Sequence, residues 1–479
     1  MRLSRLIVAT LIAWLVLANG ACAKELFDLF MSPSDEARIG EEEHPKILEE
    51  FGGVYPDPAI GVYVNSIGQF LVQTSETPNS HFTFTVLNSP VVNAFALPGG
   101  YVYVTRGILA LAGNEAELAG VIAHEIGHVT ARHSANRVGN SVLANLGLAV
   151  LGVVTGNSVV NKVGQIGAVA VLQAHSRDDE FESDRLGVRY LTRAGFSPQA
   201  MSSFLRKLEA HSNLEARISG VSPDDGLDFF ATHPRTAQRV ARAIELAQER
   251  AVTDPVVGRN IYLKKIDGLI FGDDPDQGLV KGRRFVHPVL RFEFVVPEGF
   301  TILNGQRSVV AKGRDGEALR FDFANRTQRS MENYLRNDWA QGQALFRLET
   351  LSIDGMPAAT ATIHPRVGQG DVELRLVVIG FNSESVCRFL FATPSRISKQ
   401  RRRTVEHTAL TFRRLSEAEA RTTLPLRIGF HRVAIGDTAE NIAQRMAVPD
   451  FKLERFRILN GLGPDQSLVV GRLVKLVLE

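Results

Sequence analysis

Apolar residues recur at helical spacing after Asn114, and the pattern is strongest between positions 118 and 126. Asn114 can cap such a helix at its N-terminus, and Glu117 three residues later completes a capping box. Because one stripe of the predicted helix is apolar, we expect that stripe to face a hydrophobic core. The stripe consists of Leu118, Val121, Ile122 and Ile126.

The residues before this helix predict an irregular stretch, a helix and a small sheet. Residues 24–63 are acidic and are expected to be irregular; the helix that follows has Ile60, Val64, Ile67 and Leu71 on one face. Residues 81–87 alternate as a strand does. After a Pro-Gly-Gly turn, Tyr101–Thr105 predicts a short edge strand. Its residues Tyr101, Val102, Tyr103 and Val104 would hold an extended peptide through main-chain hydrogen bonds, and a core hairpin is an equally good interpretation.

Two segments after the central helix differ in polarity. Residues 141–174 contain one charged residue, Lys162, and predict two short apolar helices. Burial in a core is the favoured interpretation. The alternative is a hairpin at a membrane surface, since each helix is too short to span a bilayer. The next segment is acidic and predicts a helix with Glu180 and Asp184 on one face.

Three further regions follow. Residues 258–282 form a Gly- and Asp-rich link, and residues 285–414 have the mixed patterns of an α+β domain without a catalytic constellation. Strands are predicted over 290–296, 318–323 and 372–380, and a helix near 331–342. Residues 424–479 predict a small module of strand, helix, helix and strand, with a capping box formed by Asp437 and Glu440.

The composition is that of a globular protein with an export signal. The 479 residues are 44% hydrophobic and 22% charged. Arg2 and Arg5 precede an apolar run, and Ala21-Cys22-Ala23 follows it, which predicts a secretory signal peptide over residues 1–23. Removing these two positive charges changes the formal net charge from +2 to 0, so no nucleic-acid partner is expected. Cys387 would then be the only cysteine, which excludes an internal disulfide.

The central helix contains His124-Glu125-Ile126-Gly127-His128. Residues four apart share a helix face, so His124 and His128 can bind one metal ion. Imidazole nitrogen is a good ligand for zinc, and a catalytic zinc has three protein ligands and an open position. Glu125 lies one step round the helix, where its carboxylate can act as the general base that takes a proton from the attacking water.

The acidic helix offers the third ligand. Glu180 can complete the zinc site, and Asp184 can accept a hydrogen bond from a ligand histidine and so fix its tautomer. Glu182 is expected to point elsewhere. Because acidic clusters are usually exposed, this assignment depends on the His-Glu-x-x-His helix that comes before it.

These motifs together resemble the gluzincin metallopeptidase family of the CAAX prenyl protease and the bacterial heat-shock membrane protease. Within the family, the nearest resemblance is to the periplasmic β-barrel-assembly-enhancing protease. It covers residues 35–250 and rests on Asn93–Gly100, His124–His128, Glu180–Asp184, and Thr232-His233-Pro234 with Arg239. The resemblance implies zinc on His124, His128 and Glu180, with Glu125 as general base. It also implies a supporting, proton-donating role for Asp184.

Thr232-His233-Pro234 predicts a helix start in which Thr232 is the cap and His233 has no required role. Two functional roles for His233 are also open. It could act with Arg239 as a donor to the oxyanion. It could instead bind zinc as a fourth ligand and hold the enzyme off until its loop moves. The family resemblance allows both roles, and the related periplasmic protease favours the second.

The C-terminal segment has a resemblance of its own. Gly436-Asp437-Thr438 and Asn460-Gly461-Leu462 are landmarks of the lysin-motif (LysM) domain, although Ala439 stands where that family usually has Leu. The resemblance implies glycan binding, and a spacer role is the alternative.

We therefore expect a multidomain protein. After the signal peptide, residues 24–257 form a mainly α zincin-type metallopeptidase domain with a small sheet. Residues 258–423 form an α+β domain of unassigned role, and residues 424–479 form a LysM-like β-α-α-β module.

The expected function is that of an exported endopeptidase, with one Zn²⁺ per chain, that cleaves misfolded or unassembled envelope proteins in the periplasm. Peptidoglycan contact through 424–479 and peripheral membrane contact through 141–174 would suit that location. The alternative is a cell-wall-binding chaperone or adaptor that uses the peptidase domain to hold clients. Glu125 argues against it, because a pure binder needs no general base. A peptidoglycan-associated hydrolase is a third interpretation.

Overall fold

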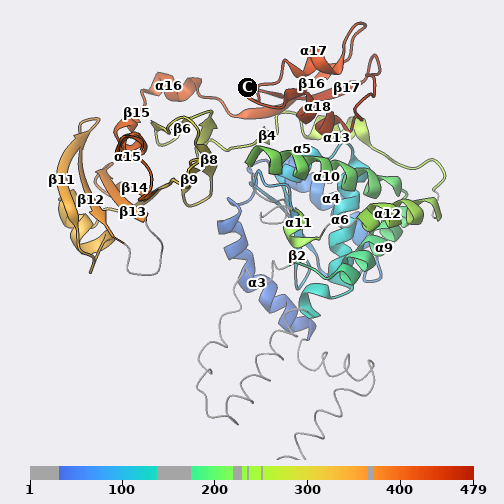
Figure 1. Ribbon diagram of the computed structural model, residues 1–479. Coiled ribbons are helices and arrows are strands. Elements are labelled where there is room, and N and C mark those ends of the chain that lie inside the picture. Colours follow the sequence, from blue (N-terminus) through green and yellow to red (C-terminus); the bar gives the residue numbers. More distant parts are fainter. Residues whose placement is uncertain (1–31, 137–173, 220–228, 235–236, 250–251, 365–371) are drawn as a thin grey trace, which may run out of the picture. The chain divides into compact units, whose positions relative to one another are not determined.

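The computed structural model describes residues 32–136, 174–219, 229–234, 237–249, 252–364 and 372–479 (Figure 1). The predicted signal peptide and nearly all of the apolar segment 141–174 lie outside these residues. The chain forms two compact units. The first comprises residues up to 269 together with 430–443 and 453–475, and the second comprises the remaining residues. In the described part of the chain, no helix is both long and apolar enough to cross a membrane.

The first unit contains a three-stranded sheet formed by β1 (Thr83–Leu87), β2 (Ala94–Leu97) and β3 (Tyr101–Thr105). Its order is β1-β3-β2, with β1 parallel and β2 antiparallel to β3. The prediction that Tyr101, Val102, Tyr103 and Val104 form an edge strand is therefore wrong, because β3 has a partner on both sides. The turn at residues 98–100 folds β3 back between the two other strands, and β2 becomes an edge.

The described helices of this unit up to residue 269 pack on the sheet or on one another. They are α3 (Pro33–Glu50), α4 (Pro58–Val72), α5 (Arg106–Leu111), α6 (Glu115–Thr130), α9 (Arg177–Arg193), α10 (Gln199–Ser219), α11 (Phe229–Thr232), α12 (Ala237–Glu249) and α13 (Arg259–Lys265). The predicted apolar face of α4 is buried. Helix α3 lies in a region expected to be irregular. Ser32 and Asp35 form its capping box, and its Ile47 is fully buried, so the acidic segment has one core-facing side.

The central predicted helix is α6, and it is buried from Ala116 to His128. Asn114 caps it as predicted, by accepting from the backbone N–H of Glu117 at 2.9 Å. The prediction that the Glu117 side chain accepts from the backbone N–H of Asn114, the reciprocal half of the capping box, is wrong. The Glu117 carboxylate accepts instead from the N–H of Gly113 at 2.6 Å and pairs with the Lys207 ammonium at 2.6 Å. The nearby cation therefore redirects this side chain.

Two glycines bring α6 and α9 close together. A Cβ at Gly127 would lie 3.2 Å from the Cα of Ser183, and a Cβ at Gly187 would lie 3.2 Å from the backbone N of His124. Both distances are tighter than ordinary contacts, so a side chain at either position would push the helices apart. This close packing places the two motif helices face to face.

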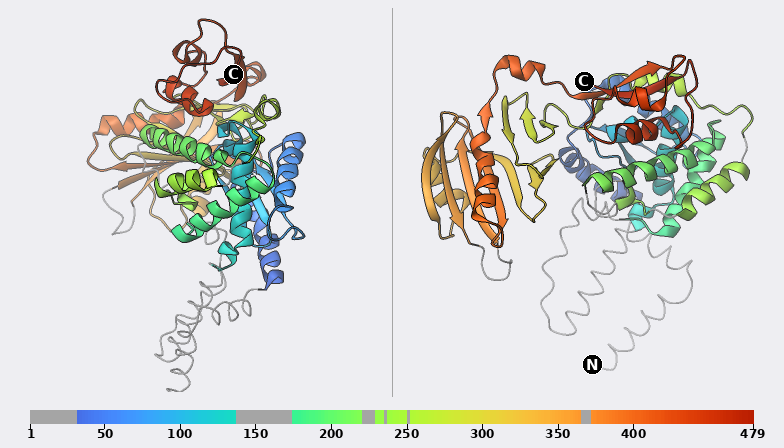
Figure 2. Two further views of the ribbon diagram at one scale, coloured as in Figure 1. Left: turned by 90° about the vertical axis from the view of Figure 1, so that its right-hand side faces the viewer. Right: turned by 45° about the horizontal axis from the view of Figure 1, so that its top comes forward.

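The second unit is built on a seven-stranded antiparallel sheet in the order β11-β12-β13-β14-β10-β9-β8, which Figure 2 shows from two further sides. Its strands are β8 (Thr301–Asn304), β9 (Val309–Lys312), β10 (Ala318–Asn325), β11 (Phe346–Ile353), β12 (Met356–Ile363), β13 (Val372–Gly380) and β14 (Ser385–Pro394). Both faces are covered. Cys387, Phe389 and Phe391 of β14 face an aromatic core that includes Val405 of α15 (Lys399–Glu406). Val386 faces a second core with α14 (Met331–Tyr334).

A smaller four-stranded sheet, in the order β15-β7-β6-β5, completes the second unit. Its strands are β5 (Leu279–Lys281), β6 (Arg284–His287), β7 (Phe292–Val295) and β15 (Arg413–Arg414). The strands expected near 290–296, 318–323 and 372–380 are present as β7, β10 and β13. Helices and sheets are thus mixed in this region as predicted.

The C-terminal residues form β16 (Leu426–Arg432), α17 (Ala439–Ala443), α18 (Lys452–Asn460) and β17 (Leu473–Leu478). The predicted capping box of Asp437 and Glu440 is wrong. Thr438 and Asn441 make the reciprocal bonds, while Asp437 accepts from the Ala434 N–H and lies 2.7 Å from His431. The resemblance to a LysM domain and the predicted domain boundaries remain predictions.

Lys475 joins the C-terminal segment to the rest of the first unit. Its buried ammonium donates to the carbonyl oxygens of Ala110, Leu111 and Ala112 at 2.6, 3.1 and 2.8 Å. These carbonyls end α5 and have no later helical N–H to bond. Burial, and then the charge of Lys207, lowers the pKa of Lys475 well below its usual value.

We expect Lys475→Met to lower the free energy of unfolding by about 1–3 kcal/mol, because three buried carbonyl groups lose their donor. Thermal unfolding of the full chain would measure this change. Lys452→Met is the matched control, since the Lys452 ammonium also donates to a carbonyl, that of Gln444 at 3.2 Å, but in an exposed position. Equal melting temperatures of the two variants would contradict the assignment.

Candidate metal centre and active site

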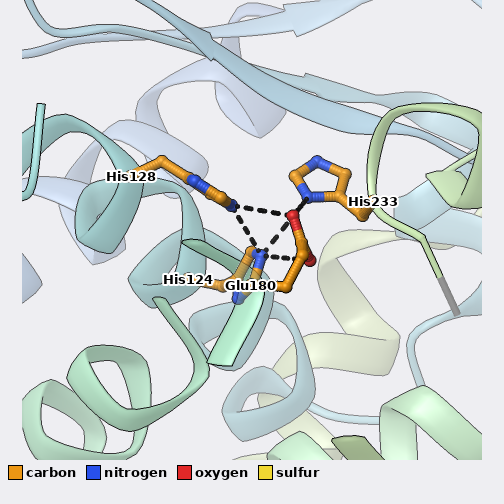
Figure 3. Close-up of side chains that lie close together, drawn as sticks. All are labelled: His124, His128, Glu180 and His233. Atoms are coloured by element: carbon orange, nitrogen blue, oxygen red, sulfur yellow. Dashed lines mark hydrogen bonds and ion pairs between the residues drawn. The ribbon is translucent and has the colours of Figure 1, made fainter. Parts of the chain in front are cut away.

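Four side chains converge on one point inside the first unit (Figure 3). His124 and His128 come from α6, Glu180 from α9 and His233 from the turn after α11. Their candidate ligand atoms all lie within 4.8 Å of one another, and all four residues are buried. The structure thus brings together the three predicted ligands and the histidine whose role was open.

The spacing of these atoms suits a tetrahedral ion. The Nε2 atom of His124 lies 3.0 Å from Nε2 of His128, 3.4 Å from Nδ1 of His233 and 3.5 Å from the Glu180 carboxylate. The carboxylate lies 3.3 Å from His128 and 2.9 Å from His233. Zinc–ligand bonds of about 2.0–2.1 Å in a tetrahedron require ligand atoms about 3.3–3.4 Å apart. The donor set therefore fits zinc.

Two of these groups have the protonation states that metal binding needs. Burial lowers the pKa of His128 well below its usual value, so its imidazole is neutral and free to coordinate. Burial opposes ionisation of Glu180, but His233 and Arg239 outweigh it and lower the pKa of its carboxyl well below the usual range. A neutral imidazole and a carboxylate are both good zinc ligands.

Asp184 and Arg239 support this centre from behind. Asp184 lies one helical turn after Glu180, and its carboxylate is 3.0 Å from Nδ1 of His124. That contact leaves Nε2 of His124 for the metal, as the sequence predicts. The Arg239 guanidinium donates twice to Asp184, at 2.8 Å each, and lies 2.5 Å from Glu180.

These contacts argue against Asp184 as a proton donor and against Arg239 as an oxyanion donor. Burial opposes ionisation of Asp184, but Arg239 and His124 outweigh it and lower the pKa of Asp184 to about 2. Asp184 therefore carries no proton to donate at neutral pH. Arg239 is 2% exposed and its guanidinium is engaged by two carboxylates, so it positions them and is not turned toward an oxyanion.

Glu125 lies beside the metal centre without belonging to it. It is fully buried, and neither carboxylate oxygen has a hydrogen bond to the described residues. Nε2 of His233 lies 3.5 Å from a carboxylate oxygen of Glu125. Burial raises the pKa of Glu125. A buried carboxylate with free oxygens and a raised pKa suits a group that accepts and returns a proton.

His233 connects the centre to the β2 edge. Its Nε2 atom lies 3.3 Å from the carbonyl oxygen of Ala94, which can accept an N–H bond and leave Nδ1 as the ligand atom. Ala94 is the first residue of β2, and Phe229 of α11 donates its N–H to the carbonyl of Val92 just before it. The segment with His233 therefore lies along β2, one of the two edge strands of the sheet.

Sequence reasoning missed a second histidine layer. Nδ1 of His133 lies 2.9 Å from Nδ1 of His128, and its Nε2 lies 3.4 Å from Glu182. His175 stacks on His128 with ring centroids 3.8 Å apart. Glu182 thus reaches the centre indirectly. The sequence feature that could have revealed this layer is His133, which lies five residues after His128, just beyond the end of α6.

The predicted peptide-binding residues of β3 do not line this centre. Tyr103 is buried and lies 2.7 Å from the imidazole of His44, and Val102 and Val104 are also buried. Because β3 is central, its main-chain groups are used within the sheet. The edge strands of this sheet are β1 and β2.

A buried His-Glu-x-x-His helix, a glutamate from a second helix and a free general base define a metallopeptidase site. Residues 61–247 match the model of peptidase family M48. This segment of the chain belongs to that family, as its motifs predict.

Curated relatives agree with the family assignment. The chain is 31% identical over 293 residues to the Beta-barrel assembly-enhancing protease of Escherichia coli (strain K12), which covers 55% of this chain and 56% of the relative. It is 34% identical over 202 residues to the protein of the same name from Yersinia pestis, covering 40% of each. The Mitochondrial metalloendopeptidase OMA1 of Schizosaccharomyces pombe is 27% identical over 45% of this chain and 62% of its own length. The matched part of the chain thus spans 40–62% of the length of these relatives.

We expect Glu180→Ala to weaken zinc binding by at least about a hundredfold, more than the 10–100-fold typical of a lost outer partner. The change removes a ligand and leaves the buried Arg239 cation beside the metal position. Zinc content after dialysis against a graded chelator would measure it. Asp178→Ala, at an exposed position two residues earlier on the same helix, is the control and should keep the zinc. Equal zinc retention in the two variants would make Glu180 the wrong ligand.

Proposed function

We propose that this chain is an exported zinc-dependent endopeptidase that cleaves misfolded or unassembled envelope proteins. One observation carries the chemical part: four buried ligand atoms at tetrahedral spacing beside a Glu125 carboxylate that has no hydrogen bond in the described residues. The proposed substrates and periplasmic location are supported by similarity to proteins named Beta-barrel assembly-enhancing protease. The predicted export signal supports the same location.

His124, His128 and Glu180 would hold the zinc ion. When bound, zinc would polarise the scissile carbonyl and make water a stronger nucleophile. Glu125 would take the proton from that water and pass it to the leaving amine. Asp184 would fix the tautomer of His124, and Arg239 would keep Asp184 and Glu180 charged and in place.

The substrate would bind as an added strand along β2. An edge strand offers main-chain groups to an extended peptide, and β2 is the edge strand nearest the metal centre. In the present arrangement its outward carbonyls have other partners. His233 approaches Ala94, and the hydroxyl of Ser134 donates to the Ala96 carbonyl at 3.3 Å.

This arrangement favours the gate role of His233. Nδ1 of His233 is at ligand distance from the other donors, so His233 would fill the position that a catalytic zinc keeps open. The same side chain approaches the carbonyl that a substrate strand would use. Withdrawal of one segment would then free both the metal position and the β2 edge.

Glu125→Gln should lower peptide cleavage by about 10²–10⁴-fold, the range typical of a lost general base. Because Glu125 is not a ligand, zinc content should stay near one per chain. Casein cleavage by the full chain, with a chelator-treated sample as a second control, would test this. Wild-type turnover in the variant would remove the proposed mechanism.

His233→Ala distinguishes the gate from the oxyanion role. The gate predicts a several-fold rise in basal cleavage and self-cleavage, because the fourth position and the strand edge become free. An oxyanion donor predicts a loss on the order of a hundredfold. His407→Ala, at an exposed position, is the control. Unchanged rates in His233→Ala would exclude both roles.

A further inference from the structure

A cavity that is separate from the metal centre lies within the first unit, at the N-terminal end of α6. Its volume is about 480 Å³, and none of the metal ligands lines it. Its walls come from the start of α6, the middle of α10, the start of α13, and α18 with the loop that follows. The metallopeptidase chemistry described above does not use it.

Positive charge gathers in this cavity. Five basic side chains and one acidic side chain line it, which gives a net charge of +4. Lys207 is the only one of the five paired with the lining acid, Glu117, at 2.6 Å. Arg457 reaches outward to Glu440 at 3.0 Å. The remaining three are Arg206, Arg259 and Arg472.

These three arginines have few partners among the described residues. Arg259 donates to the carbonyl oxygen of Leu473 at 2.9 Å. The side chains of Arg206 and Arg472 make no hydrogen bond or ion pair with the part of the chain that the structure describes. Burial, together with the nearby charge of Arg472, lowers the pKa of Arg259 to about 10. Like charges that line one cavity favour a bound anion, because an anion would reduce their repulsion.

We propose that this cavity binds a phosphate-bearing anion, with Arg206, Arg259 and Arg472 as its principal contacts. Guanidinium groups match phosphate oxygens in a two-bond geometry, and several arginines together match more than one negative charge. A net charge of +4 exceeds what a single carboxylate would neutralise, so a ligand with two or more phosphate charges fits better. The source is either a soluble polyphosphate or the headgroup of an anionic lipid.

An anion bound in this cavity would hold the C-terminal segment to the peptidase helices. Arg472 belongs to the C-terminal segment, whereas Arg206 lies on α10 and Arg259 begins α13. A ligand that contacts all three would bridge elements far apart in the sequence. It would therefore stabilise the folded unit by RT ln(1 + L/Kd), where L is the concentration of free anion.

Titration of the full-length protein with tripolyphosphate, followed by calorimetry and by thermal unfolding, would test the proposal. We expect saturable binding of one tripolyphosphate per chain, a rise in melting temperature, and weaker binding as salt increases. The double variant Arg206→Gln/Arg472→Gln should weaken binding tenfold or more. The control Arg336→Gln/Arg403→Gln removes the same charge from exposed positions of the second unit and should bind as the wild type does.

Sedimentation with vesicles of phosphatidylcholine and phosphatidylglycerol distinguishes the two sources. Pelleting that the Arg206→Gln/Arg472→Gln variant loses and the control variant keeps would assign the cavity to a lipid headgroup. Tripolyphosphate binding without pelleting would assign it to a soluble ligand. Absence of tripolyphosphate binding, or equal loss in both double variants, would overturn the proposal. Because every readout is binding or stability, the result is independent of peptidase activity.

Discussion

Burial of several like charges at one point is the constraint on which the metal centre depends. Glu125, Glu180 and Asp184 are each fully buried, and the Arg239 guanidinium contacts two of them, Glu180 and Asp184. Three carboxylates and one guanidinium carry a net charge of −2 if all ionise, and uncompensated buried charge is costly. A divalent cation would balance it. Without a metal, protons serve instead: burial raises the pKa of Glu125, and Asp184 and Glu180 outweigh burial to raise that of His124 to about 9. Metal binding and proton release are therefore linked.

Helix α6 connects the metal centre to the rest of the first unit. Its metal-binding half packs closely on α9, because Gly127 and Gly187 leave no side chain between the two helices. Its other end carries Glu117, whose carboxylate pairs with Lys207 and faces the cationic cavity. Seven residues separate Glu117 from His124, which is about 10 Å along the helix axis. Since every residue from Ala116 to His128 is buried, the helix cannot shift at one end without disturbing the packing at the other.

Local sequence signals predicted which candidate ligands lie together on one helix, because i, i+4 spacing is enough to place His124 with His128. They failed where tertiary contacts decide. Tyr101–Thr105 has the pattern of any short strand, and only the pairing with β1 on its second side makes it central. The sequence did not predict helix α3, because its many acidic residues resemble those of an exposed irregular segment although one side of the helix is buried. The positioning role of Arg239 and the contact of His133 with His128 depend on the approach of separate elements, which spacing along the chain does not reveal.

In the proposed gate, the position of His233 would join two forms of inhibition in one segment. A ligand that occupies the open metal position competes with water and substrate, and a group that approaches the Ala94 carbonyl competes with the substrate strand. The contact with the Ala94 carbonyl is modest by itself, since a net hydrogen bond contributes about 0.5–1.5 kcal/mol. Acting together, the two contacts need only exceed the cost of ordering a short segment to keep most molecules closed. A substrate strand that pairs with β2 would compete for the same carbonyl, so substrate binding itself would shift the population toward the open state. An enzyme gated in this way would be restrained without a separate inhibitory domain, and the threshold for opening would be set by how well an extended peptide pairs with β2.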